Sequence, residues 1–284
     1  MQQDSSCRPI LSRSEHVIGA LGSCPMDDNW DEVNEQLIPI FDLLGKHYRF
    51  SKSQHEHRRG AFNAVTCGIS YGGGQQRVAN LAQTPHNQAV LDGVMCKCAV
   101  HCIANFGGSV MCLLAPHMFE TYNAILEEVC AHDTCLRCNF PGNPFAAATF
   151  NVSLHTVTYG HMNHLNPPNG MCSITTIGNF DPTLGEHLVL WDLKLVIEFP
   201  PGSTILIPSA LLKHSNICLH DTSNEFRHSF VQYSVGGIFR WVECGHQSQK
   251  DFKTAGHRYK ETGKQRWQRG LALFSKWSDL FPGM

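Results

Sequence analysis

The middle of the chain contains four informative segments, which read His161-Met162-Asn163, HLVLWDLKLVIEFPPGSTILIPS (187–209), His214-Ser215-Asn216 and Arg227-His228-Ser229. The second histidine follows the first by 53 positions (214 − 161), and the arginine comes 13 positions later (227 − 214). Residues 187–209 are rich in β-branched and aromatic side chains on either side of a Pro-Pro-Gly turn, which favours short strands. Pairing of such strands can bring two imidazoles and a guanidinium to one place.

The same pattern extends over the second half of the chain. Turn signals such as NPPNG (166–170) and DPTLG (181–185) separate short β-rich runs, which is typical of a sandwich or jelly roll. We therefore expect an α+β fold with a double-stranded β-helix (jelly-roll) core and supporting helices at both ends. The expected strands are NVSLHTVTY (151–159), CSITTIGNF (172–180), HLVLWDL (187–193), LKLVIEF (193–199), STILIPS (203–209) and FRHSFVQYSVGGIFRW (226–241).

The spacing of the polar residues indicates a metal site. Non-haem Fe(II) oxygenases hold iron with two histidines and one carboxylate, and leave the remaining positions for a co-substrate and oxygen. His161, residue 163 and His214 have the order expected for such ligands. Arg227 could clamp the far carboxylate of 2-oxoglutarate by two parallel hydrogen bonds. Residue 163 is the exception, because asparagine offers only a neutral oxygen to a dication.

Longer motifs resemble a known family. Residues 150–216 together with FRHSFVQYSVGGIFRWV (226–242) look like the TET/JBP-type 2-oxoglutarate and Fe(II)-dependent dioxygenases encoded with fungal DNA transposons. The segments RRGAF (58–62), GISYGGGQ (68–75) and WQRGLALFSKW (267–277) extend the resemblance to residues 58–281. The resemblance implies oxidation of 5-methylcytosine in DNA to 5-hydroxymethylcytosine or further, with Fe(II) and 2-oxoglutarate as cofactors.

The family's site residues can be carried over by position. His161 and His214 resemble the iron ligands, Arg227 resembles the 2-oxoglutarate arginine, with Ser229 beside it, and Asn163 falls where the family has aspartate. Two further departures accompany Asn163. Gly185-Glu186 replaces the usual Gly-Gly, and Met171 replaces a frequent aromatic residue.

Other nearby side chains are poor replacements for the missing carboxylate. On a strand approaching the metal, His164 would point away from Asn163, and the same argument applies to Met162. A distant acid such as Asp181 is no better placed by the alternation of strand side chains.

Several residues are candidates for nucleic-acid contact. They are Arg58 and Arg59 before the first resemblance motif, Gly73 in a triple-glycine loop, and Asn166 after the metal pair. The glycine loop has the alternative interpretation of a tight turn, and Asn166 that of a turn residue. Between residues 250 and 269, Lys250, Lys253, Arg258, Lys260, Lys264, Arg266 and Arg269 outnumber Asp251 and Glu261. This basic segment is either a solvated face or a phosphate-binding surface.

The remainder of the chain is expected to support this core within one domain. We expect a lead and helix over 1–57, helical and loop support over 58–147, the core over 148–245 and a basic C-terminal helix over 246–284. Residues 1–26 show no periodicity, whereas Asp27-Asp28 precede an apolar stripe that predicts a helix over about 29–44, kinked near Pro39. A second helix is expected over 116–130.

Composition limits the remaining possibilities. A net charge of −2 indicates no strong overall preference for a charged partner, and no apolar run is long enough for a membrane span. We expect a soluble, intracellular monomer that acts on DNA in the nucleus. The 13 cysteines then predict buried or reactive thiols, although Cys130, His132, Cys135 and Cys138 have the alternative interpretation of a zinc site.

Three hypotheses follow. The first is a nucleic-acid dioxygenase, active despite Asn163. The second is a catalytically degenerate, transposon-derived DNA-binding protein with the same fold. The third is a cupin-like jelly roll that holds a metal for other chemistry.

Overall fold

A large antiparallel sheet forms the centre of the molecule. The computed structural model describes residues 7–25 and 29–283, so Asp27 and Asp28 lie outside the described residues. The strands of this major sheet hydrogen-bond in the order β1-β2-β11-β8-β13-β7-β5-β6. Their bounds are β1 Arg8–Leu11, β2 Val17–Ser23, β11 Thr204–Ile207, β8 Cys172–Asn179, β13 Phe226–Tyr233, β7 Ala147–Asn151, β5 Ala64–Ser70 and β6 Ala79–Asn80.

A smaller sheet faces part of the major sheet and closes the jelly roll. It has the order β10-β9-β12, with β10 at Leu195–Ile197, β9 at Leu188–Leu190 and β12 at His214–Asn216. Apolar side chains from both sheets form one buried cluster, which contains Cys172, Ile174, Leu188, Leu190, Phe199, Ile205 and Ile207. The expected α+β fold with a jelly-roll core is therefore confirmed.

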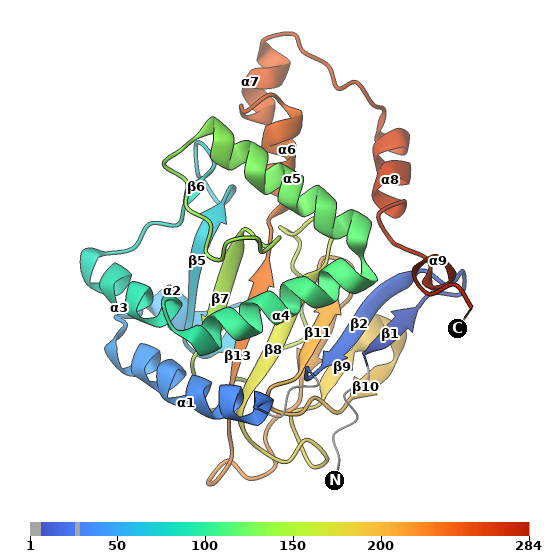
Figure 1. Ribbon diagram of the computed structural model, residues 1–284. Coiled ribbons are helices and arrows are strands. Elements are labelled where there is room, and N and C mark those ends of the chain that lie inside the picture. Colours follow the sequence, from blue (N-terminus) through green and yellow to red (C-terminus); the bar gives the residue numbers. More distant parts are fainter. Residues whose placement is uncertain (1–6, 26–28, 284) are drawn as a thin grey trace.

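Helices cover the other face of the major sheet (Figure 1). These are α1 (Trp30–His47), α3 (Pro85–Met95), α4 (Cys98–Leu114) and α5 (Pro116–His132). In α1 the buried residues are Trp30, Leu37, Phe41 and Leu44, spaced so that one stripe of the helix faces the sheet. The predicted helices at about 29–44 and 116–130 are thus confirmed, and α1 continues through Pro39 as one helix.

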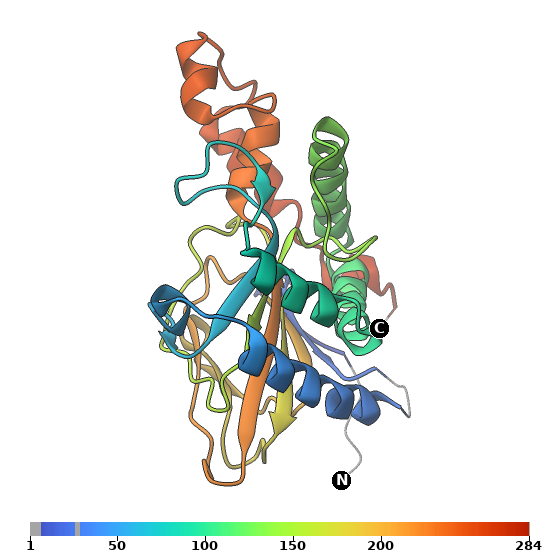
Figure 2. The same ribbon diagram turned by 90° about the vertical axis from the view of Figure 1, so that its left-hand side faces the viewer.

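The remaining elements are short. They are α2 (Lys52–His55), β3 (Glu56–His57), β4 (Gly60–Ala61), the 3-10 helix η1 (Trp191–Leu193), α6 (Gly236–Glu243), α7 (Gln249–Thr254), α8 (Gly263–Leu271) and α9 (Trp277–Leu280). Figure 2 shows that α6 and α7 project beyond the sheets.

The N-terminal lead and the C-terminal tail differ from expectation. Within the lead, β1 and β2 are ordered strands, because β2 pairs with β11 at the edge of the major sheet. The lead was therefore wrongly expected to be irregular over these residues. The tail forms α7, α8 and α9 in place of one basic helix. Gly256 adopts φ +79° after α7, and a capping box at Thr262 starts α8.

The expected strands are also shorter than the sequence suggested, most clearly at three places. Of residues 151–159 only Asn151 belongs to a strand, and the chain then leaves the sheet. Of residues 187–193, the last three form η1. The run 226–241 changes from β13 to α6 at Gly236-Gly237. Glycine is required there because a Cβ on Gly237 would lie 2.4 Å from the carbonyl oxygen of Tyr71.

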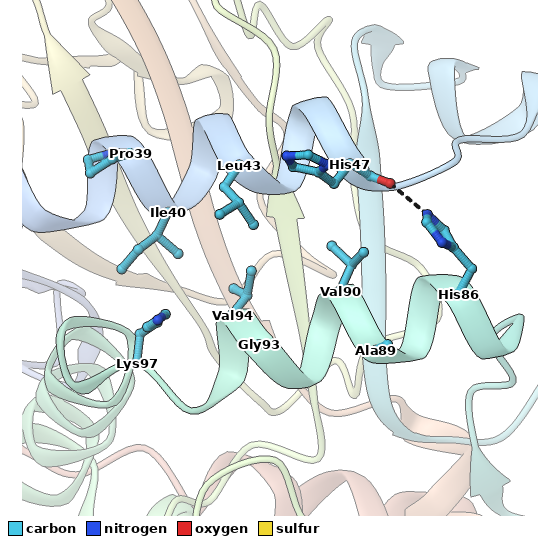
Figure 3. Close-up of a pocket in the computed structure, with 10 residues that line it drawn as sticks. All are labelled: Pro39, Ile40, Leu43, His47, His86, Ala89, Val90, Gly93, Val94 and Lys97. Atoms are coloured by element: carbon cyan, nitrogen blue, oxygen red, sulfur yellow. Dashed lines mark hydrogen bonds between the residues drawn. The ribbon is translucent and has the colours of Figure 1, made fainter.

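An apolar groove of about 470 Å³ lies between α1 and α3, away from the histidine motifs (Figure 3). Ile40 and Leu43 of α1 face Val90 and Val94 of α3, and His86 bonds the carbonyl oxygen of His47 at one end. In the part of the chain that the structure describes, no single helix is long and apolar enough to cross a membrane. The helices α3 and α4, which are joined at a sharp bend, reach the length and apolar composition of a membrane span only when they are counted together.

Candidate metal and co-substrate site

His161 and His214 are brought together at the edge of the smaller sheet. Their backbones form an antiparallel bridge with N–O distances of 3.0 Å in both directions. The ring centroids are 4.3 Å apart. His161 Nδ1 donates to the carbonyl oxygen of Tyr159 (2.7 Å), and His214 Nδ1 donates to that of Leu212 (2.8 Å). Because a carbonyl only accepts, both Nε2 atoms carry the lone pair that a metal requires.

Burial keeps both imidazoles neutral. It lowers the pKa of His161 to about 4, with a further contribution from His214. Burial also lowers the pKa of His214 below its ordinary value. Neutral rings with a fixed Nδ1–H and an available Nε2 fit two ligand positions of a transition-metal site.

Asn163 lies beside these histidines but is held by an arginine. Arg58 Nη2 donates to the Asn163 side-chain oxygen (3.3 Å), and Arg58 Nη1 donates to the carbonyl oxygen of Met162 (2.7 Å). The oxygen that would face a metal is thus neutral and already accepts from a cation. The third ligand position does not fit iron.

No other described side chain completes the set. Among residues 7–25 and 29–283, no group of three or more His, Cys, Asp or Glu side chains is placed to hold a metal. His164 is exposed, and it lies in a turn and not on the strand that the sequence argument assumed. Asp181 is also exposed and accepts hydrogen bonds from Thr183 instead.

Arg227 lies in the interior and is already paired with an acid. Its side chain is 4% exposed, and its Nε lies 2.9 Å from Glu186 Oε2. The two groups form an ion pair, but the Nε–H bond does not point at the carboxylate oxygen, so Nε–H makes no hydrogen bond. Nη1 donates to the carbonyl oxygen of Thr156 (3.0 Å). The guanidinium expected to clamp 2-oxoglutarate is therefore engaged within the chain, so the arginine as it stands does not fit this co-substrate.

Ser229 follows Arg227 on β13 and shares its inward face, because alternate strand residues point to the same side. Its Oγ accepts from Asn151 Nδ2 (2.9 Å) on β7. Val231, the next residue on this face, lines a cavity of about 340 Å³ next to Asn163. The inward face of β13 thus runs from Arg227 to this cavity.

The cavity is the place where most of the expected nucleic-acid contacts meet. Two arginines line it, and no carboxylate does. Its lining residues are Arg58, Arg59, Thr66, Ser70, Leu81, Thr149, Asn163, Leu165, Asn166, Val231, Tyr233 and Val235. Burial lowers the pKa of Arg59, whose guanidinium lies 5.8 Å from the centre of the Phe62 ring.

Asn166 is a turn residue, as the alternative interpretation predicted, and it also lines the cavity. It closes a turn through its backbone N–H to the carbonyl oxygen of Asn163 (2.9 Å), and its Nδ2 donates to Ser209 Oγ while the residue lines the cavity. Gly73 lies in an exposed loop between β5 and β6, where Gly72, Gly73 and Gly74 all have positive φ. The loop leaves the cavity wall at Ser70 and returns to it at Leu81.

The cysteines do not form a zinc site. Cys130 Sγ and Cys138 Sγ are 3.4 Å apart, but His132 stacks on His246 and Cys135 is exposed. Of the thiols expected to be buried or reactive, four are buried, namely Cys24, Cys67, Cys172 and Cys244, whereas Cys96, Cys98, Cys112, Cys135, Cys138 and Cys218 are exposed. Cys130 and His132 are two positions apart on α5, so their side chains point in different directions.

Comparison with known proteins identifies the fold. No family model and no curated protein match the chain. A solved structure of NgTET1 in complex with 5mC DNA matches with a TM-score of 0.57 and 14% identity, over 82% of this chain and 77% of that one. The chain has the fold of that protein. A member of the 2OG-Fe(II) oxygenase family from Burkholderia pseudomallei matches with a TM-score of 0.39 and 14% identity, over 74% and 93% of the two chains.

Two contacts at the candidate site escaped the sequence reasoning. One is the pairing of Glu186 with Arg227, and the other is the contact of Arg58 with Asn163. The substitution of Gly by Glu at residue 186 was the available signal. Nothing local in the sequence indicates where the carboxylate of Glu186 would point.

Proposed function

We propose that this chain is a catalytically degenerate protein of the TET/JBP type, which binds DNA containing modified cytosine but does not oxidise it. The observation that carries the proposal is the state of residue 163. Asn163 offers a neutral oxygen that already accepts from Arg58. Two neutral imidazoles and an amide supply no negative charge to a dication, which weakens its binding strongly in a partly buried site.

The cavity beside Asn163 supports the DNA-binding part of the proposal. Its volume of about 340 Å³ and its lining by Arg58, Arg59 and Asn166 suit a base that has left the duplex. The arginines supply positive charge for the phosphate backbone, while the side-chain amides supply donors and acceptors for a base edge. The likeness in fold to a protein solved with 5mC DNA supports the same ligand class.

A binding assay tests this proposal. Fluorescence anisotropy with 5-methylcytosine and unmodified duplexes should show binding that weakens with salt and favours the modified duplex. Arg58→Ala and Arg59→Ala should each weaken binding, whereas Arg13→Ala, at the exposed turn between β1 and β2, serves as the matched control. Equal effects of all three substitutions, or no binding at low salt, would refute the proposal.

Oxidation of 5-methylcytosine remains the second candidate, because the arrangement of His161 and His214 favours it. Incubation with Fe(II), 2-oxoglutarate and methylated DNA, followed by mass spectrometry, decides between the two. The degenerate protein yields no hydroxymethylcytosine. Product formed over several turnovers by the unaltered chain would overturn the first candidate in favour of the second.

The proposal includes a place and a state of assembly. A DNA ligand implies action in the nucleus, and one cavity bounded by segments of a single chain implies action as a monomer. Sedimentation of the purified protein with and without DNA tests the second point.

A further inference from the structure

Glu186 occupies an unfavourable backbone position in the interior. Its φ is +59°, in the left-handed region that favours glycine, and its side chain is fully buried. A charged residue at such a position suffers both backbone strain and loss of hydration. The carboxylate must therefore be held by strong local interactions.

Two interactions hold it. Glu186 Oε2 lies 2.9 Å from Arg227 Nε and accepts a hydrogen bond from Asn216 Nδ2 (2.8 Å). Asn216 also donates to the carbonyl oxygen of Thr156, which accepts from Arg227 Nη1 as well. The other carboxylate oxygen, Oε1, has no hydrogen-bond partner among the described residues.

This network adjoins the two histidines. Asn216 follows His214 by two positions on β12, so both side chains point to the same side of the smaller sheet. His155 forms a bridge with Arg227, and residues 156–161 lead from there to His161. The carboxylate of Glu186 is thus joined through Asn216 to the strand that carries His214, and it is paired with Arg227 on β13.

We propose that Glu186 is an internal substitute for a ligand carboxylate and excludes free dicarboxylates such as 2-oxoglutarate from Arg227. The inference rests on the proposed function in one respect, namely that Arg227 stands at the co-substrate position. The charges give the physical reason. Arg227 and Glu186 form a neutral buried pair, and a second carboxylate would add a buried negative charge with no cation to balance it. A ligand can reach the guanidinium only by displacing Glu186.

Removing the carboxylate should open the site. Glu186→Gly suits the left-handed backbone, and it leaves the Arg227 guanidinium available. Titration calorimetry with glutarate, which has both carboxylates but lacks the keto group that chelates metal, isolates the arginine contact. We expect Glu186→Gly to bind glutarate at least about tenfold more tightly than the unaltered chain. The double variant Glu186→Gly/Arg227→Leu should lose this gain.

A second readout covers the risk that an unbalanced Arg227 destabilises the variant. Acetate should raise the melting temperature of Glu186→Gly more than that of the unaltered chain, because it replaces the missing carboxylate. Glu186→Gln keeps the side-chain volume and removes the charge, so its glutarate affinity should lie between the other two.

The inference is overturned if the unaltered chain, Glu186→Gly and Glu186→Gln all bind glutarate with equal affinity. It is also overturned by a folded Glu186→Gly that responds to neither glutarate nor acetate, since Arg227 is then no carboxylate site. Failure of the proposed function shows separately, as loss of binding to methylated DNA by the unaltered chain.

Discussion

Arg58 donates one hydrogen bond to the side-chain oxygen of Asn163 and a stronger one to the carbonyl oxygen of Met162, at 3.3 and 2.7 Å. The two side chains are 105 residues apart in sequence. The contact holds Asn163 in the lining of the cavity and directs its side-chain oxygen towards the Arg58 guanidinium. A metal ion would have to compete with this guanidinium for a neutral oxygen.

Restoring the carboxylate should restore metal affinity. Asn163→Asp adds one negative charge opposite His161 and His214, and we expect Mn²⁺ or anaerobic Fe(II) to bind at least about tenfold more tightly in titration calorimetry. Asn166→Asp is the matched control, because it adds the same charge to the same cavity but lies outside the ligand set. An equal gain in both variants would show that general cavity charge, and not the ligand position, controls affinity.

Product formation should require two substitutions. If Glu186 excludes 2-oxoglutarate, Asn163→Asp alone should give little hydroxymethylcytosine, and Asn163→Asp/Glu186→Gly should give clearly more. Mass spectrometry of methylated DNA after incubation with Fe(II) and 2-oxoglutarate measures the difference. Full product from Asn163→Asp alone would show that the carboxylate of Glu186 is no obstacle.

Stability should fall as the pH is lowered from about 7 towards 4. Burial lowers the pKa of His161 and His228 to about 4, below the ordinary value of 6.5. The unfolded chain therefore binds more protons than the folded chain in this window. Each such histidine can remove up to about 1.4 kcal/mol of unfolding free energy per pH unit.

Urea denaturation at pH 7, 6 and 5 measures this slope. His228→Gln should show a shallower slope, because one titrating ring is gone. Glu186 acts in the opposite sense, since burial raises its pKa in spite of Arg227. A stability that is constant or rises on acidification to pH 5 would contradict the prediction.

The helix-facing core should be sensitive to truncation. Phe230 on β13 is 1% exposed, and its ring centre lies 5.0 Å from that of Phe150. Phe230→Ala should lower the free energy of unfolding by about 3–5 kcal/mol. Leu113→Ala on α4, where the side chain is 53% exposed, should change it by less than about 0.5 kcal/mol. Chemical denaturation compares the two.

The basic C-terminal segment should contribute to DNA affinity through lysines that form no ion pair with the described residues. Arg269 is paired with Glu243 and Glu261 (3.7 and 3.0 Å), whereas Lys260 and Lys264 form no ion pair within the described residues. Alanine at both lysines should lower the slope of log affinity against log salt by about 0.9 for each DNA phosphate that the segment no longer neutralises. Arg269→Ala should change the slope less, and a slope that none of these substitutions changes would exclude this segment as the phosphate surface.

The sequence predicted the fold class because strand and turn signals are local. The runs Cys172–Asn179 and Thr204–Ile207 are rich in β-branched residues and buried at nearly every position, and both lie in the major sheet. The strand signals failed at 151–159 and at 236–241, where the same residue types leave the sheet. Close approach of Gly237 to Tyr71 depends on a distant segment, so periodicity could not reveal it.

The sequence by itself determined the chemistry of each position, namely two histidines 53 residues apart, an amide at residue 163 and a glutamate at residue 186. Only the tertiary structure decided which groups meet. Arg227 pairs with Glu186 and Arg58 with Asn163 because strands and loops from distant parts of the chain converge on one cavity wall. Residue type sets charge and hydrogen-bonding capacity locally, whereas the partner that satisfies them is set by packing over long range.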